Sequence, residues 1–252
     1  MDHFQSAGHV ADALRPDVPV TCLRPQAATR AARWFTTNFD GAVLYAVKAN
    51  PAPEMLRALW AGGVRRFDVA SLNEVKLVRS LFPDAMLALM HPVKSPETIR
   101  TAYFDHGVRV FALDSEAELV KILEATGHAR DLTLCVRLSV ANTFAKLSLG
   151  AKFGIGLTKA PALLLKTRQH AARLGLCFHV GSQTMSPTAY AAALEAARKA
   201  ITRAGVVLDV LDIGGGFPAV YPGMTPPAMH LFIDEIKAAL ARMPITETCE
   251  IW

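Results

Sequence analysis

Eight short apolar runs, separated by amphipathic stretches, constrain the fold of this chain more than any other feature. They cover residues 43–47, 66–70, 86–90, 108–113, 132–138, 176–180, 207–213 and 248–252. Their β-branched residues and their apolar character on both faces are typical of strands buried in a parallel sheet. Eight such strands alternating with eight helical stretches favour an α/β fold of the closed (β/α)8 TIM-like barrel type. A doubly wound open sheet is the competing fold, although it usually has fewer strands.

Helix-start signals lie between the apolar runs. Capping boxes, in which a serine is followed three residues later by a glutamate, begin at Ser71 and Ser115. A further helix is expected over 27–38, and the polar, glycine-rich residues 140–159 are expected to form a long loop. We therefore predict an N-terminal extension over 1–24 and one barrel domain over 25–252. A hydroxyl residue precedes a proline, which suits the first helical position, at Ser95-Pro96, Ser186-Pro187 and Thr225-Pro226.

Length and composition exclude several classes of protein. A single barrel needs about 250 residues, and this chain has 252. With 52% hydrophobic and 19% charged residues, the chain is not a disordered one. The net charge of +5 comes from scattered lysines and arginines, which argues against a nucleic-acid-binding surface.

Membrane segments, disulfides and metal centres are not expected either. The longest stretch without a charged residue, 213–233, is interrupted by glycines and prolines, so it does not form a spanning helix. The N-terminus lacks the apolar region of a signal peptide. The four cysteines lie far apart and form no C-x-x-C pair. We therefore predict a reduced, cytoplasmic protein that binds neither membranes nor metals.

Polar residues or glycines follow the predicted strands at their carboxyl ends. Barrel active sites lie at these ends, because all parallel strands open onto the same mouth. Convergence of polar groups from many strands predicts an active site rather than a packing contact. The residues are Lys48, Asp68, His91, Asp114, Arg137, His179, Ser182 and Gly214 to Gly216.

Lys48 ends the first apolar run. If its amine is partly desolvated there, its pKa falls and the amine becomes available for Schiff-base chemistry. The alternative is a lysine whose ammonium reaches solvent while its alkyl stem packs against the strand. The run alone does not decide between these two interpretations.

The glycine run Gly214 to Gly216 and the segment around His179 are candidates for ligand binding. Three glycines let the backbone approach a ligand and leave N–H groups for a phosphate, whereas a flexible loop is the other interpretation. His179 could stack on a planar ligand and Ser182 could donate to a phosphate, although buried histidines are more often structural. His91 and Asp114 are better explained as turn or capping residues. A reactive lysine, a phosphate loop and a stacking imidazole together describe a pyridoxal 5′-phosphate site.

The same residues stand in motifs that resemble the fold-type III pyridoxal-phosphate-dependent decarboxylases, the ornithine, lysine and diaminopimelate decarboxylase family. The resemblance covers nearly all of residues 20–250, and FDVAS and LDIGGGFP are closer to the ornithine-type branch. In family order, the matching segments are YAVKANP (45–51), RFDVASLNEV (66–75), HPVKS (91–95), KFG (152–154), FHVGSQ (178–183) and LDIGGGFP (211–218).

The resemblance implies catalytic and phosphate-binding roles. Lys48 would carry the Schiff base with pyridoxal phosphate, and His179 would stack against the pyridine ring. Ser182 and the glycines Gly214, Gly215 and Gly216 would hold the phosphate.

Other matching residues would complete the cofactor pocket. Asp68 and Ala70 would line it. Arg137 matches an arginine of the fifth strand. Lys146 stands where family members commonly have an arginine shortly before KFG, in a segment that aligns less well.

Two parts of the family pattern are absent from this sequence. The Glu-Pro-Gly-Arg motif, expected just past the eighth strand, supplies a glutamate for the pyridine nitrogen and an arginine for the phosphate. The C-terminal β-domain supplies substrate-binding residues. We therefore expect a barrel truncated before the β-domain and nearly inactive by itself. Robust turnover would mean instead that some residue within 1–252, such as Asp212 or Glu250, replaces the lost glutamate.

The function implied by the resemblance is decarboxylation of a basic amino acid, ornithine to putrescine being preferred, by a cytoplasmic homodimer whose partner is a small-molecule substrate. Alternatives are a lysine or diaminopimelate decarboxylase, an alanine-racemase-like or cofactor-carrier barrel, and a non-catalytic decarboxylase-like regulator. Retention of Lys48 favours an enzyme, whereas absence of the glutamate favours a regulator. A class I aldolase would more usually carry its lysine on a later strand.

Overall fold

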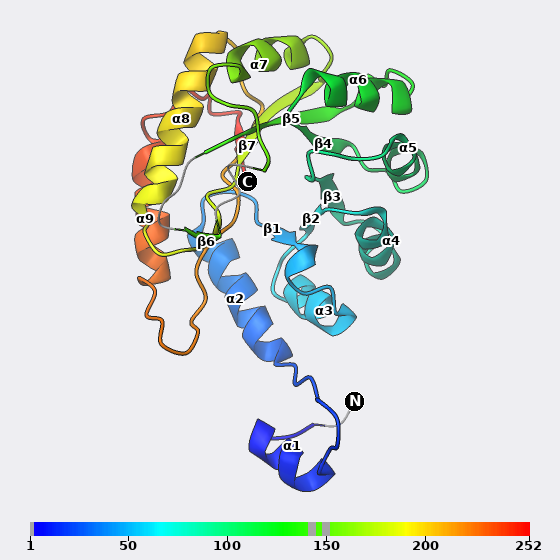
Figure 1. The fold of residues 1–252 in the computed structure, drawn as a ribbon, viewed down its shortest axis with the longest axis vertical. Coiled ribbons are helices and arrows are strands. Elements are labelled where there is room, and N and C mark those ends of the chain that lie inside the picture. Colours follow the sequence, from blue (N-terminus) through cyan, green and yellow to red (C-terminus); the bar gives the residue numbers. More distant parts are fainter. Residues whose placement is uncertain (1–2, 141–144, 148–151) are drawn as a thin grey trace.

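Eight parallel strands form one sheet that curls into a barrel (Figure 1). The structure is a computed structural model, and it describes residues 3–140, 145–147 and 152–252. Neighbouring strands in the sheet follow chain order. The strands are β1 (Leu44–Ala46), β2 (Arg66–Val69), β3 (Met86–Leu89), β4 (Val110–Leu113), β5 (Thr133–Leu138), β7 (Arg173–Phe178), β9 (Val210–Asp212) and β10 (Glu250–Ile251).

Helices surround these strands, while the first helix lies apart from the barrel (Figure 1). Helix α1 (Ala7–Leu14) belongs to the N-terminal extension. None of the helices in the described ranges has the length and apolarity that crossing a membrane requires. The barrel helices are α2 (Pro25–Asn38), α3 (Pro53–Ala61), α4 (Leu72–Leu81), α5 (Pro96–Phe104), α6 (Glu116–Ala125), α7 (Ala160–Arg168), α8 (Thr188–Ala204) and α9 (Met229–Leu240).

The first and last strands meet at a seam that closes the ring. The backbone N–H of Ala42, just before β1, donates to the carbonyl of Ile251 at 2.8 Å. Strand β10 also pairs in parallel register with β9, where Ile251 lies opposite Leu211. The first and last predicted strands are therefore neighbours, as a closed barrel requires and an open sheet does not.

Two apolar cores occupy the two faces of the sheet. Outward side chains such as Phe67 and Leu134, both fully buried, pack against the helices. Inward side chains, among them Ala88, Cys135 and Trp252, form a smaller core inside the barrel. Successive strand residues point to opposite faces, so each short run contributes to both cores.

Charged residues fill the end of the barrel interior where the strands begin. Glu250 accepts from Arg66 at 2.8 Å and from Arg173 at 2.7 Å, and the indole N–H of Trp252 donates to the same carboxylate at 3.0 Å. The expectation that the strands are apolar on both faces therefore holds for the middle of the inward face and is wrong toward its ends. Only the middle of the interior is shielded from water at both ends, so only that layer has to be apolar.

Four helix starts and one loop can be compared with the sequence prediction. Ser71 and Ser115 cap α4 and α6 as predicted. Helix α9 begins after Ala228 and not at Thr225-Pro226, because Pro227 disfavours helical backbone at the residue before it. Helix α8 has Pro187 as its N-cap. The predicted 140–159 loop contains β6 (Ala145–Leu147), which pairs antiparallel with β8 (Ser182–Thr184).

Candidate active site

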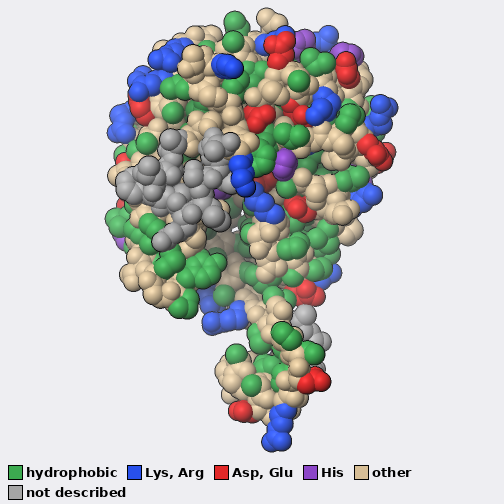
Figure 2. Space-filling model, in the orientation of Figure 1, with side chains coloured by type: hydrophobic (Ala, Val, Ile, Leu, Met, Phe, Trp, Pro, Cys, Tyr) green, Lys and Arg blue, Asp and Glu red, His purple; other side chains and the backbone are tan. Residues whose placement is uncertain are grey.

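A cavity of about 650 Å³ opens at the carboxyl ends of the strands. The hollow lies near the centre of Figure 2, with lysine and arginine side chains at its edge. Most of the predicted site residues line this cavity. They are Lys48, Asp68, Ala70, His91, Arg137, His179, Gly214, Gly215 and Gly216.

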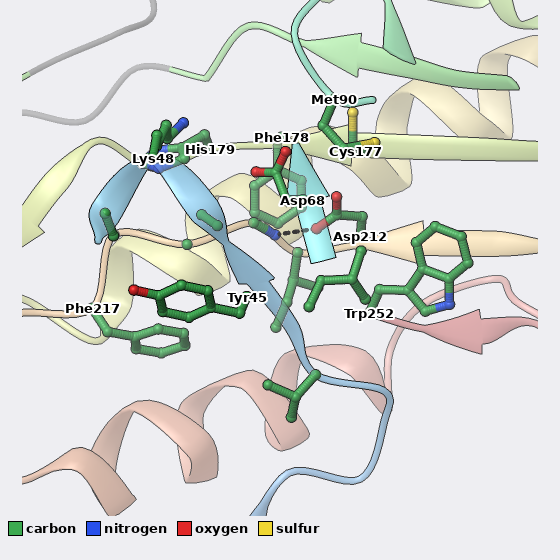
Figure 3. Close-up of a pocket in the computed structure, with 18 of the residues that line it drawn as sticks. Tyr45, Lys48, Asp68, Met90, Cys177, Phe178, His179, Asp212, Phe217 and Trp252 are labelled. Carbon is green, nitrogen blue, oxygen red and sulfur yellow. Dashed lines mark hydrogen bonds between the residues drawn. The ribbon is translucent and has the colours of Figure 1, made fainter. Parts of the chain in front are cut away.

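Lys48 stands at the mouth of the cavity. Strand β1 ends at Ala46, and the chain then makes one 3-10 turn over Val47–Ala49. Val47 is fully buried, and the tight turn exposes Lys48 beside His179 (Figure 3). The exposed position of Lys48 agrees with the interpretation in which the lysine reaches solvent. The turn that follows the strand, rather than the apolar run itself, decides where the ammonium lies.

His179 follows β7 and is held in one orientation. Its Nδ1 accepts from the backbone N–H of Gly181 at 2.9 Å, so the neutral ring carries its proton on Nε2. Burial, together with the nearby charges of Lys48 and Arg137, lowers the pKa of His179 to about 4. The imidazole is therefore neutral at physiological pH.

The glycine run is a rigid cradle and not a flexible loop. Gly214 and Gly216 have φ of +72° and +108°, and an added Cβ would lie 2.0 Å from the carbonyl oxygen of Phe178 and 2.2 Å from that of Gly181, respectively. Tyr190 donates from its hydroxyl to the carbonyl of Gly215 at 3.1 Å. Within the described residues, no acceptor takes the N–H of Gly215 or Gly216. Two backbone donors therefore remain available for an anion such as a phosphate.

Asp68 and Asp212 lie near one another in the lining of the cavity (Figure 3). Burial raises the pKa of Asp68 to about 6 and that of Asp212 to about 7. Lys48 and Arg137 oppose the shift at Asp68, while the N–H of Gly214, which donates to Asp212 Oδ1 at 2.8 Å, opposes it at Asp212. The pair therefore keeps a proton to a pH closer to neutral than an ordinary carboxyl does, Asp212 more than Asp68.

Three other predicted residues lie elsewhere. Ser182 begins β8 and is half-buried, but it is not among the residues that line the cavity. Lys146 belongs to β6, and its side chain lies outside the described residues. Glu250 is held by two arginines at the opposite end of the interior, so it is no substitute for a glutamate at the mouth. Asp212 is the one of the two acidic candidates that reaches the cavity.

An aromatic wall of the cavity was missed by the sequence analysis. Phe35 and Phe39 come from α2 and the following residue, and Tyr45 comes from β1. The ring of Phe35 lies 5.3 Å from that of Phe217, which follows the glycine run. No local pattern shows that one face of α2 reaches the mouth, because this contact joins residues that are far apart in the sequence.

The pyridoxal binding domain of the pyridoxal-dependent decarboxylase family matches residues 26–252. The chain belongs to this family. Its closed barrel fold and its pyridoxal cofactor, both predicted from the sequence, are therefore confirmed at the level of the family. The residues that line the mouth are those expected to meet that cofactor, but their individual roles remain predictions.

Curated relatives include enzymes and one inhibitor. A lysine/ornithine decarboxylase of Selenomonas ruminantium is 42% identical over 198 residues, which cover 76% of this chain and 47% of that protein. Antizyme inhibitor 2 of Homo sapiens is 34% identical over 179 residues, which cover 69% of this chain and 38% of that protein. The chain thus spans about half the length of the curated relatives it matches.

Solved structures share the barrel at similar identity. Lysine decarboxylase from Selenomonas ruminantium superposes with a TM-score of 0.84 at 30% identity, covering 100% of this chain and 66% of that one. A lysine/ornithine decarboxylase from Vibrio vulnificus, complexed with putrescine, gives a TM-score of 0.80 at 31% identity, covering 98% and 66%. The decarboxylase barrel therefore accounts for the whole described fold.

Proposed function

We propose that this chain is the pyridoxal-binding barrel of a decarboxylase that converts a basic amino acid, ornithine in preference to lysine or diaminopimelate, to its diamine. The observation that carries the proposal is the meeting of Lys48, His179 and the glycine run at one cavity, from β1, β7 and β9. The lysine/ornithine decarboxylases among the relatives support the substrate class, and the putrescine in one of them supports the product.

The residues at the mouth fit pyridoxal phosphate. The cradle that a Cβ would fill leaves the N–H groups of Gly215 and Gly216 for a phosphate. Ser182, at the start of β8, would be a further donor. The exposed amine of Lys48 would attach the aldehyde, and Ala70 would border the ring. When bound, this cofactor supplies an electron sink for the electron pair that remains after CO2 departs.

The protein's own groups would set the charge around the ligand. Neutral His179 presents an uncharged ring face next to Lys48, so it packs without repelling the lysine. The pair Asp68 and Asp212 holds a proton near neutral pH, and Asp212 Oδ1 is already engaged by Gly214 N–H. The proton therefore lies on Asp212 Oδ2 or on Asp68, where it faces the cavity. Arg137 adds a second cation for an anionic ligand.

Covalent trapping tests the assignment of Lys48. Wild-type protein mixed with pyridoxal phosphate and reduced with borohydride should carry the cofactor on the peptide that contains Lys48. Lys48→Ala should lose that label, while Lys76→Ala, which removes an exposed lysine of α4, should keep it. Equal labelling of Lys48→Ala and wild type would assign the role to a different lysine.

Activity is tested separately from binding. We expect the 252-residue chain to release little CO2 from labelled ornithine, lysine or diaminopimelate, because its sequence lacks the glutamate and the acidic partners that the family supplies for the distal amine. A longer version that carries a Glu-Pro-Gly-Arg motif and a β-domain should act on one of the three, ornithine first. Robust turnover by the 252-residue chain would show instead that Asp212 is sufficient.

A non-catalytic regulator is the second candidate, because one relative is named as an antizyme inhibitor. Lys48 distinguishes the two functions. A regulator has no need of a lysine that attaches the cofactor, so absence of trapped label in wild-type protein would favour it. The proposed assembly is a homodimer in the cytoplasm, and light scattering on the purified longer protein tests the dimer.

A further inference from the structure

A buried lysine holds the rim of the cavity between β3 and β5. The side chain of Lys94 is 1% exposed, and its Nζ donates to the carbonyls of His91 at 2.9 Å and Ala112 at 2.6 Å. The same ammonium lies 3.0 Å from Glu118 Oε1, whose side chain is 3% exposed. Lys121 also pairs with Glu118. Burying an ammonium is costly unless its partners are well placed, so this cluster fixes the backbone at His91.

An aromatic contact extends from His91 to Arg137. The ring of His91 meets that of Phe153 edge-on, with centroids 5.2 Å apart. The guanidinium of Arg137 lies over the same Phe153 ring, 5.4 Å from its centroid. The backbone N–H of Gly154 donates to Asp114 at 2.9 Å and holds the neighbouring residue in place. All three of His91, Phe153 and Arg137 line the cavity.

Arg137 depends on this aromatic contact for its position. Within the described residues, no hydrogen bond joins its guanidinium to a protein acceptor, and Asp68 interacts with it through charge. Among the described residues that line the cavity, Lys48 is the one lysine and Arg137 is the one arginine. Displacing Phe153 therefore displaces one of the two strong cations that an anionic ligand meets.

We propose that Lys94 is a positioning residue for the active site: by pinning the backbone of His91, it sets the ring of His91 against Phe153 and thereby places Arg137 in the cavity. The placement of Arg137 is independent of the proposed function. Its effect on pyridoxal phosphate rests on that function.

The side-chain N–H signal of Arg137 tests the placement without any cofactor. A ring 5.4 Å away shifts the NMR signal of the guanidinium Nε–H, and Arg137→Lys identifies that signal by its loss. Phe153→Leu shows where the Arg137 Nε–H signal lies when the Phe153 ring is absent. Lys94→Met should move the signal most of the way toward the Phe153→Leu position. Lys166→Met, which breaks the exposed ion pair of Lys166 with Glu116 at the start of α6, should leave it unmoved.

A second variant covers a failure of Lys94→Met to fold. Lys94→Met combined with Glu118→Leu removes both buried charges, so it avoids an unpaired carboxylate while still releasing His91. An Arg137 signal at its wild-type position in either folded variant would overturn the proposal. Pyridoxal phosphate affinity should fall about tenfold in the variants with a shifted signal, as for contacting residues of one network. If wild-type protein binds no cofactor, the proposed function fails, but the Arg137 signal still decides the positioning role.

Discussion

Gly214 and Gly223 allow backbone strain to be separated from steric contact. Both residues have left-handed backbone, with φ of +72° and +75°. A Cβ on Gly214 would lie 2.0 Å from the carbonyl oxygen of Phe178, whereas a Cβ on Gly223 would meet nothing within 4 Å. Alanine therefore brings the same strain to both positions, but it collides with the end of β7 only at Gly214.

The expected losses of stability follow from these two terms. Left-handed backbone costs an alanine about 1–2 kcal/mol. Forcing a methyl group into packed atoms adds about 1–3 kcal/mol. Gly223→Ala should therefore lower the free energy of unfolding by about 1–2 kcal/mol, and Gly214→Ala by about 2–5 kcal/mol. Gly215→Ala, whose Cβ would lie 3.7 Å from His179 Nε2, should stay within about 0.5 kcal/mol of wild type.

Urea unfolding of the four proteins measures these differences, provided that the slopes of the transitions agree. The ranking matters more than the absolute values, because all three variants remove one glycine from the same segment of the chain. Equal losses for Gly214→Ala and Gly223→Ala would refute the close approach of the glycine run to β7. A large loss for Gly215→Ala would refute the open space beside His179.

Three further outcomes follow from the structure. Burial raises the pKa of Asp68 to about 6 and that of Asp212 to about 7, so their contribution to the free energy of unfolding is complete below about pH 4 and is lost as the pH rises to about 7. Asp212→Asn should therefore flatten the decline of stability that urea unfolding measures across this pH range. Parallel pH profiles for wild type and variant would contradict the raised pKa of Asp212. Hydrogen bonds, that from Arg66 first, lower the pKa of Glu250 to about 2, so its stabilisation is present above about pH 4.5 and is lost toward pH 2. Glu250→Gln should cost about 1 kcal/mol at pH 7 and leave cofactor affinity, measured by absorbance titration, unchanged. Ser71→Ala, which removes the cap of α4, should cost about 1 kcal/mol in thermal unfolding, whereas Ser80→Ala on the same helix should cost less.

The strands were predictable because burial on a parallel sheet requires apolar runs. Seven of the eight predicted runs contain a strand of the barrel, and the run 176–180 overlaps β7, which begins earlier, at Arg173. The charged residues on the inward face of the strands could not be predicted, because an apolar run is recognised by its average hydrophobicity. Arg66 and Asp68 alternate with the buried Phe67 and Val69, so one strand carries both a core face and a polar face. No local sequence pattern indicates that the barrel interior has ion pairs where the strands begin and a cavity where they end.

The site residues likewise include some that local sequence patterns predict and others that they do not. Lys48, His179 and the glycine run could be found because strand ends in a parallel barrel share one mouth. The exposure of Lys48 could not be predicted, because it depends on a single 3-10 turn. Phe35 was also beyond reach, since its neighbour Phe217 lies on a distant segment of the chain. Local pattern thus predicts which strand carries a group, whereas turns and long-range packing decide where that group points.

Closure of the ring between Ala42 and Ile251 has a consequence for the order of events during synthesis. Lys48 emerges early, whereas Gly216 follows after a stretch that takes roughly ten to thirty seconds to translate at typical rates. Strand β9 reaches β1 through the ladder of the other strands, but the direct seam between the two stays open until β10 docks there. A nascent chain therefore has all but one of its barrel strands, and both the amine and the glycine cradle, before residues 250–251 emerge to close the ring.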